Sequence, residues 1–514
     1  MKKYFLFLLI LISATSIAQI PEDVLRYSWH THNGSARYMA IGGAMGSLGG
    51  ELSASFINPA GLGLFKSGAL SFSPAFLHNQ NESNYRDAAG KQIHNAFSFG
   101  QLGYVAGFSD PTDASKTHAI SIGFNQTINF NNHIQYAALN NYSSFSEQFA
   151  EEFAKANLSI NDVLSSNSPL PYTAAPALYT YLMDTVTING IVQIKTAPEY
   201  LLDSGKSVFQ SMDKTTRGGL YELAISFASN IKEKWLYGIT LGIPIMSYHS
   251  QTTFTESDPT TDTSNKFGSF TYTDNYKTSG VGINAKFGVI YRPKPYIRLG
   301  LAIHTPHFLS LSDTRTTRLT TNLEGPIAQY DCASTIFTNN QAGVSKYGFN
   351  SAWKAIISGS YVFREEENIK RQRGFLSADV EYVRHRASRF TSNNELPTKE
   401  ETAYYKQLNT VVKNEYKSCV NVRIGGELKY NVMMGRLGFA YYSNPYKDLA
   451  FRAGKTMLSG GLGYRDKGIF IDLTYVYTMS KDVDLPYRLA DRDNTFANIN
   501  QQQGNVVATF GVKF

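Results

Sequence analysis

The residues whose types suit catalysis or metal binding are few in this chain, and their spacing is unfavourable. Two histidine pairs, His30-x-His32 and His304-x2-His307, could each supply two metal ligands, but neither has a cysteine or carboxylate at ligand spacing. Serine, histidine and aspartate all occur, yet the sequence holds no G-x-S-x-G elbow of the α/β-hydrolase kind. We therefore predict no enzyme, no metal and no cofactor, and keep an esterase or protease as the enzymatic alternative.

Six charged residues lie in segments that are otherwise apolar or small. Carboxylates and an arginine at alternate positions, as at Asp379, Glu381 and Arg423, would suit acid–base catalysis. Mutual pairing inside the protein is the better interpretation, since a buried charge needs a partner. We expect these charges to line a lumen and to anchor a segment packed inside it; they are Lys286, Arg298, Asp379, Glu381, Arg423 and Glu427.

The segments that carry these residues alternate with a period of two from Ala69 onward. Tyr221, Leu223, Ile225 and Phe227, for example, alternate with a glutamate and small residues. In a membrane β-barrel, such strands turn the apolar face to lipid and the polar face to the lumen. A soluble sandwich would alternate in the same way, but here the apolar faces are unusually aromatic. The sequence thus favours an all-β, antiparallel transmembrane β-barrel.

The alternating segments number about 14, and single-chain bacterial barrels have an even number of strands. The predicted strands are residues 69–77, 95–108, 118–130, 220–231, 235–248, 279–291, 297–304, 352–363, 374–383, 420–430, 436–442, 457–464, 469–477 and 505–514. Several connections are only a few residues long. The long ones, which barrels place at the outer surface, are 131–219, 249–278, 305–351, 384–419 and 478–504.

The first 18 residues have the features of a secretory signal peptide, namely two lysines, an apolar run and a small-residue end. A membrane anchor is the alternative. The formal net charge is +7, but lysine and arginine form no run that would favour nucleic-acid binding. Cys332 and Cys419 are too few for a disulfide framework, and a single bridge between them stays open.

A glycine- and alanine-rich stretch from Gly34 to Phe65 has neither a helical nor a strand period. Its glycines permit tight turns, and Pro59 fixes a bend after an extended Asn58. Such a stretch suits a compact plug inside a barrel. The expected domains are therefore a signal peptide at 1–18, an N-terminal plug at 19–66 and the barrel at 67–514.

Two of the long connections carry helix signals. Ser144 and Glu147 form a capping box, and Phe145, Phe149 and Phe153 follow on one helix face. These three rings either pack the connection onto the barrel rim or line the mouth through which an apolar ligand enters. Residues 401–416 offer a second, weaker helix.

The last strand alternates up to a terminal Phe514, which is the pattern that outer-membrane barrels present for assembly. We therefore expect Phe514 to engage the barrel assembly machinery. In strand 118–130, Gly123 favours a kink and Gln126 interrupts an apolar row. These two residues either ease packing against the plug or mark a weak point in the wall.

The sequence resembles the FadL-type outer-membrane transporters, the family of the long-chain fatty acid and toluene transporters. The resemblance covers plug and barrel, and it rests on Ser279–Asn284, Gly288–Pro293 and Leu299–Pro306 together with the plug motif. The plug-motif residues are Gly34, Arg37, Gly42, Gly43, Asn58, Pro59 and Ala60.

This resemblance implies a 14-stranded barrel in a bacterial outer membrane, closed by an N-terminal hatch. It further implies uptake of small hydrophobic compounds such as long-chain fatty acids, with sideways release into outer-membrane lipid near strand 118–130. The lateral-exit residues would be Gly123 and Gln126, and we expect a monomer. The alternative function is a surface adhesin or receptor whose barrel only anchors functional loops.

Overall fold

The computed structural model describes residues 21–111, 113, 115–188, 191–260, 262–263, 265–324, 329–363, 373–448, 451 and 453–514. The predicted signal peptide at 1–18 lies outside the described residues.

The main element is a closed antiparallel barrel of 14 strands, as the sequence predicted. The barrel closes where β1 (Ala69–Tyr85) pairs with β21 (Ala497–Lys513). The other uninterrupted strands are β2 (Ala88–Ser109), β7 (Val208–Ile231), β8 (Trp235–Ser257), β9 (Ser269–Lys294), β17 (Ser418–Tyr430), β18 (Met433–Tyr442), β19 (Lys455–Asp466) and β20 (Ile469–Asp484).

The remaining four strands are interrupted, so each carries two labels. They are β3 (Thr117–Asn129) with β4 (Asn132–Asn140), β10 (Ile297–His304) with β11 (Phe308–Asn322), β14 (Lys354–Phe363) with β13 (Gly343–Asn350), and β15 (Gly374–Arg384) with β16 (Arg389–Ser392). The two halves of an interrupted strand share at least one neighbouring strand of the wall, as when β10 and β11 both pair with β9.

Much of what the sequence assigned to long connections is strand, which corrects the predicted boundaries. On β8 the outer face is apolar from Trp235 to Ile245, a length that suits a tilted strand crossing a bilayer. Beyond this band the strand continues with polar residues on the same face, Ser247, His249 and Gln251. The predicted strand is too short because the apolar alternation, on which the prediction rests, stops at the membrane surface.

The outer wall is apolar all round the barrel. Along β8, Trp235, Tyr237, Ile239, Leu241 and Ile245 are 38 to 52% exposed. An exposed apolar surface of this extent needs lipid around it. With the barrel fold, it places the protein in a bacterial outer membrane. In the described part of the chain, no helix is long and apolar enough to cross a membrane.

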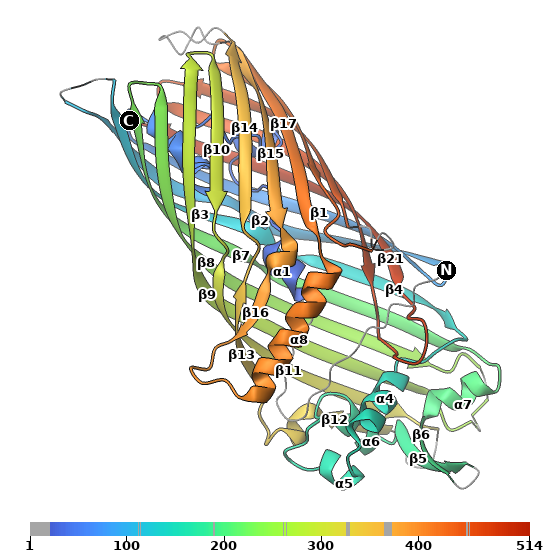
Figure 1. Ribbon diagram of the computed structural model, residues 1–514. Coiled ribbons are helices and arrows are strands. Elements are labelled where there is room, and N and C mark those ends of the chain that lie inside the picture. The colour runs from blue at the N-terminus through green and yellow to red at the C-terminus, as the bar shows by residue number, and fades with distance from the viewer. Residues whose placement is uncertain are drawn as a thin grey trace, which may run out of the picture.

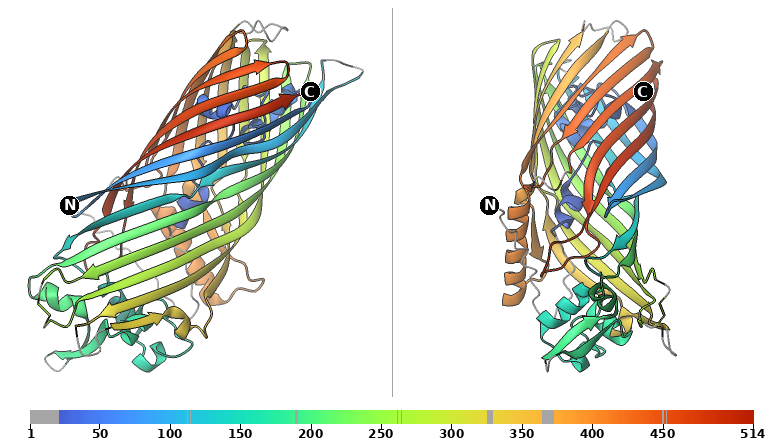
Figure 2. Two further views of the ribbon diagram at one scale, coloured as in Figure 1. Left: turned by 180° about the vertical axis from the view of Figure 1, so that it is seen from behind. Right: turned by 90° about the vertical axis from the view of Figure 1, so that its right-hand side faces the viewer.

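A helical N-terminal segment lies inside the barrel, toward the end that carries the C-terminus (Figure 1; Figure 2). It comprises α1 (Asp23–Ser28), α2 (Ala36–Ala40), α3 (Ala54–Ile57) and the short helix η1 (Pro59–Leu64). We call residues 21–65 the plug. The domain boundaries at 18/19 and 66/67 stay predictions.

A cap covers the opposite end of the barrel (Figure 1). It contains α4 (Glu147–Ala156), α5 (Ile160–Val163), α6 (Ala174–Tyr179), the hairpin of β5 (Met183–Ile188) and β6 (Ile191–Thr196), α7 (Ala197–Asp203), β12 (Gln329–Ala333) and η2 (Ser334–Phe337). The predicted second helix is α8 (Lys399–Glu415), which follows the short helix η4 (His385–Ala387) and β16. α8 lies beside the barrel (Figure 2).

Phe145, Phe149 and Phe153 are buried in the core between the cap and the barrel. The ring of Phe145 stacks on that of Phe254 of β8, with 4.3 Å between centroids. Half of the predicted capping box is present, since Glu147 Oε1 accepts the Ser144 N–H at 2.6 Å. This placement fits the packing alternative, and a role in ligand uptake stays a prediction.

Deleting Phe510–Phe514 should abolish normal surface levels. The segment pairs with β1 on one side and β20 on the other, so its loss opens the seam that closes the barrel. Surface labelling and heat-resistant migration in detergent measure the outcome. Val506→Ala, an outward change on the same strand, should leave both unaltered. Normal surface levels after the deletion would contradict the assembly role predicted for Phe514.

Candidate functional site

The plug contacts the barrel wall backbone to backbone, at wall positions occupied by glycine. A Cβ atom at Gly100, Gly300, Gly425 or Gly438 would collide with the plug backbone at Gly34, Gly46, Ile41 or Gly42, respectively. These wall glycines come from β2, β10, β17 and β18, so the plug is gripped from around the lumen. Within the plug, Gly42 and Gly43 adopt positive φ angles of 62° and 77°.

The predicted Asn58-Pro59-Ala60 bend lies against β8, β9 and β10. Asn58 Nδ2 donates to the Gly46 carbonyl at 2.6 Å within the plug and to the Val289 carbonyl at 3.3 Å in the wall. Its Oδ1 accepts the Ala60 N–H at 3.2 Å and so caps η1. The bend packs against Gly238 and Gly288, which are paired on β8 and β9. A side chain at either position would collide with Pro59 or Asn58.

The six predicted lumen charges are buried, and Arg298, Asp379 and Glu427 contact the plug. Arg37 of α2 pairs with Glu427 at 3.1 Å. Arg298 donates to the Leu48 carbonyl at 2.7 Å, and Asp379 accepts the Gly46 N–H at 3.1 Å. Breaking a buried charge pair by removing one partner costs about 3–5 kcal/mol. These contacts therefore oppose displacement of the plug.

The charges also pair with one another across the wall. Arg423 lies 3.5 Å from Glu381 and 3.6 Å from Asp379. Several partners of these charges were not predicted, including Glu222 and Arg436. Lys286 pairs with Glu222, and Arg436 pairs with Glu427 at 2.6 Å. Both lie on inward positions of alternating strands, a signal that was available in the sequence.

In each of the two predicted histidine pairs, the two histidines contact different residues. His32 Nδ1 lies 2.9 Å from the Tyr442 hydroxyl, whereas the His30 ring lies 4.8 Å from the His307 ring. His304 Nε2 is 2.7 Å from the Ile57 carbonyl of the plug. Across the described ranges, no cluster of three or more His, Cys, Asp or Glu residues is arranged to hold a metal ion.

The wall is interrupted between β2 and the strand formed by β3 and β4. Among the described residues, β3 pairs with β2 only as far as Asn125 opposite Gln101, and β4 pairs with β7 alone. A bulge shifts the register of β3 against β7 between Gln126 and Ile128. The strand then stops at Asn129 and resumes as β4. We call residues 126–131 the wall break.

β4 turns inward after the wall break and lies against the lumenal side chains of β1. The carbonyls of Asn131 and Gln135 accept hydrogen bonds from Asn79 and Ser83 of β1, at 2.8 Å and 2.7 Å. Because these donors point into the lumen, β4 has left the plane of the wall and entered the barrel. Among the described residues, the edge of β2 from Ala88 to Gly100 therefore has no strand partner on this side.

The two predicted exit residues differ in their position relative to the wall break. Gly123 lies in the paired region of β3, and a Cβ atom there would meet Phe56 of the plug at 3.2 Å. Gln126 lies at the wall break but is buried, with 2% of its surface exposed, which corrects the expectation that it faces lipid. The bulge between Gln126 and Ile128 breaks the alternation of the strand, so the Gln126 side chain does not point outward with the apolar residues before it.

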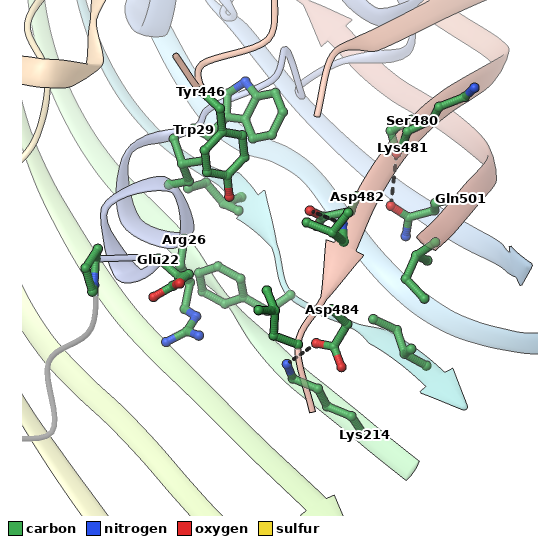
Figure 3. Close-up of a pocket in the computed structure, with 18 of the residues that line it drawn as sticks. Glu22, Arg26, Trp29, Lys214, Tyr446, Ser480, Lys481, Asp482, Asp484 and Gln501 are labelled. Carbon is green, nitrogen blue, oxygen red and sulfur yellow. Dashed lines mark hydrogen bonds and ion pairs between the residues drawn. The ribbon is translucent and has the colours of Figure 1, made fainter. Parts of the chain in front are cut away.

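A cavity of about 590 Å³ opens beside the wall break. Figure 3 shows the plug residues Glu22, Arg26 and Trp29 on one side and Asp482, Asp484 and Gln501 on the other. Its volume lies in the range of ligand pockets, roughly 300–1,000 Å³. Its apolar lining comes from the plug, the wall break, β4, α8, β20 with the residue after it, and β21: Leu25, Trp29, Ile128, Phe130, Ile134, Tyr404, Leu408, Val411, Val483, Leu485 and Ile499.

The cavity also carries charged side chains, and two pairs of them are matched. Lys214 lies 2.8 Å from Asp484, and Arg488 pairs with Glu22. Lys455 stands over the Trp29 ring, 4.3 Å from its centroid. The cavity thus combines an apolar surface with a charged rim, which suits an amphipathic or a small apolar ligand.

Comparison with known proteins finds similar structures but no similar sequences. No family model matches the chain, and no curated protein matches it by sequence. The solved structure of a Pseudomonas aeruginosa FadL homologue aligns over 94% of this chain and 99% of its own, at 11% identity and a TM-score of 0.51. The P. putida toluene transporter TodX aligns over the same shares, at 13% identity and a TM-score of 0.49.

At this level of identity, the likeness to the FadL homologue concerns the fold. It agrees with the structure itself, which is a closed barrel with an apolar outer wall and an N-terminal segment inside. The chain therefore has the FadL-type fold, that of the outer-membrane transporter family which its sequence resembles.

Proposed function

We propose that the protein takes up small hydrophobic compounds, such as long-chain fatty acids, and releases them sideways into outer-membrane lipid. The observation that carries this proposal is that one cavity is lined by both the plug and the wall break, through Leu25 and Trp29 on one side and Ile128 and Phe130 on the other. A molecule held there lies beside the place where β2 and β3 part.

The physical reason for a sideways route is the free energy that it costs to expose an apolar solute to water. An apolar solute gains about 25 cal/mol for each Å² removed from water. A straight path through the lumen would meet the plug, whose backbone is packed against the wall glycines. A lateral path takes the solute from an apolar cavity to lipid without crossing an aqueous lumen.

Filling the cavity should slow uptake. Ile134 of β4 lines the cavity, so Ile134→Trp should reduce the rate at which a fluorescent long-chain fatty acid and radiolabelled toluene enter proteoliposomes. The matched control is Leu139→Trp on the same strand, because Leu139 is 56% exposed on the outside. Uptake of both probes at the wild-type rate by a folded Ile134→Trp protein would contradict the proposal.

The two probes also address the cargo. Uptake of the fatty acid but not of toluene would indicate that the cargo is amphipathic and that its polar group binds the charged side chains of the cavity. Absence of transport by the wild-type protein for either probe would favour the adhesin or receptor alternative, in which the barrel anchors the cap.

A further inference from the structure

The wall break is bridged by side-chain amides. Where β2 and β3 part, the Phe99 N–H of β2 donates to Gln126 Oε1 at 3.1 Å, in place of a strand partner. The Ser98 hydroxyl donates to the same oxygen at 3.2 Å and accepts Asn129 Nδ2 at 3.0 Å. Three side chains therefore stand in for the missing backbone ladder.

One residue of the plug completes this bridge. Asn33 Nδ2 donates to the Phe99 carbonyl of β2 at 2.9 Å and to the Gln126 carbonyl of β3 at 2.6 Å. Its own carbonyl accepts Asn125 Nδ2 at 3.0 Å. A single plug amide thus bonds to both sides of the wall break.

The backbone next to Asn33 is fitted to this position. Gly100 of β2 occupies an irregular point where the register with β1 shifts, and a Cβ atom there would collide with the Gly34 carbonyl. Only a glycine at position 100 lets the plug approach β2 closely enough for the Asn33 amide to reach across. On the outside, Phe97 of the same strand is 71% exposed, so the bridge lies directly behind the lipid-facing wall.

On the basis of the lateral route proposed above, we propose that Asn33, Ser98, Gln126 and Asn129 form an amide latch that couples the wall break to the plug. In a membrane, backbone N–H and C=O groups must be paired. Asn33 and Gln126 supply partners to the backbone groups of Phe99 and Gln126, and parting β2 further from β3 would break these hydrogen bonds. Withdrawal of Asn33 with the plug removes the partner of both carbonyls at once.

The coupling runs in both directions, because a linkage between two sites is reciprocal. A ligand that wedges β2 from β3 strains the Asn33 contacts and loosens the plug near Gly34. A ligand that displaces α1 from the cavity pulls on the same segment and loosens the wall break. The latch keeps the side exit closed until cargo occupies the cavity.

Hydrogen exchange at the Phe99 amide tests the latch without any cargo. Gln126→Met removes the acceptor at similar length, and Asn33→Ala removes the plug donor. Both should speed exchange of the Phe99 amide in detergent by tenfold or more, a threshold that we set for a lost hydrogen bond. Gln135→Met, an amide change on the exposed face of β4, should leave it unaltered. Unchanged Phe99 exchange in folded Gln126→Met and Asn33→Ala proteins would overturn the latch.

A disulfide lock tests the route separately. Cysteines at Ser98 and Asn129, in a protein whose Cys332 and Cys419 are replaced by serine, should cross-link because the native side chains touch. The oxidised protein should lose uptake of the fluorescent fatty acid and regain it on reduction, while Asn33→Ala should raise the rate. Full uptake through a cross-linked wall break would contradict the lateral route and leave the exchange result to decide on the latch.

Discussion

A barrel that lacks residues 21–65 should show a several-fold higher single-channel conductance in planar bilayers than the intact protein. The plug fills the lumen with buried residues, and its backbone touches the wall at Gly300, Gly425 and Gly438. Barrels of more than about eight strands enclose a lumen wider than their own side chains fill. Removing the plug therefore leaves a water-filled pore lined by the charges that had held it.

A plug fixed to the wall is the matched control. The Ser47 and Ser360 hydroxyls lie 3.0 Å apart, one on the plug and the other on β14, so cysteines at these positions should form a disulfide. The cross-linked protein should keep the low conductance of the wild type, oxidised or reduced. Heat-resistant migration of the deletion variant shows that its barrel has folded. Unchanged conductance of a folded deletion variant would mean that the plug does not seal the lumen.

The strand number and the position of the plug could be read from the sequence because they rest on local patterns. Apolar residues at alternate positions indicate which face of a strand lies against lipid, as along Trp235–Ile245. The glycines between Gly42 and Gly63 indicate a segment whose backbone packs closely against its surroundings at most of those positions. The charges expected to hold the plug, such as Arg298 and Asp379, stand out because they interrupt apolar strands.

What could not be predicted depends on residues far apart in the chain. Beyond Ile245 the outer face of β8 carries polar residues, so the apolar alternation that predicts a membrane-facing strand ends there. Gln126 looked misplaced in an apolar row, yet a bulge follows it, and its side chain accepts the Phe99 N–H while its backbone carbonyl accepts the Asn33 amide. The cavity joins residues as distant as Leu25, Phe130 and Ile499, and no periodicity in the sequence connects them.

Replacing Gly123 by phenylalanine should abolish uptake of hydrophobic compounds while leaving a folded, heat-resistant barrel. Gly123 faces the lumen opposite Gly103, and a Cβ atom there would lie 3.2 Å from Phe56 and 3.4 Å from Leu52. Both plug residues are buried, so a phenylalanine ring has no free space to enter. Overpacking of this kind costs about 1–3 kcal/mol, which the plug can relieve by shifting away from β3.

The matched control is Ile122→Phe, the neighbouring residue on the outer face of β3. Ile122 is 49% exposed toward lipid, so a larger ring is accommodated there without touching the plug. Uptake of the fluorescent fatty acid into proteoliposomes separates the two variants, and conductance reports whether the plug has shifted. Asn33 belongs to the same plug, so we expect a shifted plug to move Asn33 away from the wall break as well. A folded Gly123→Phe protein that transports at the wild-type rate would show that the fit between plug and β3 has no bearing on the route of the cargo.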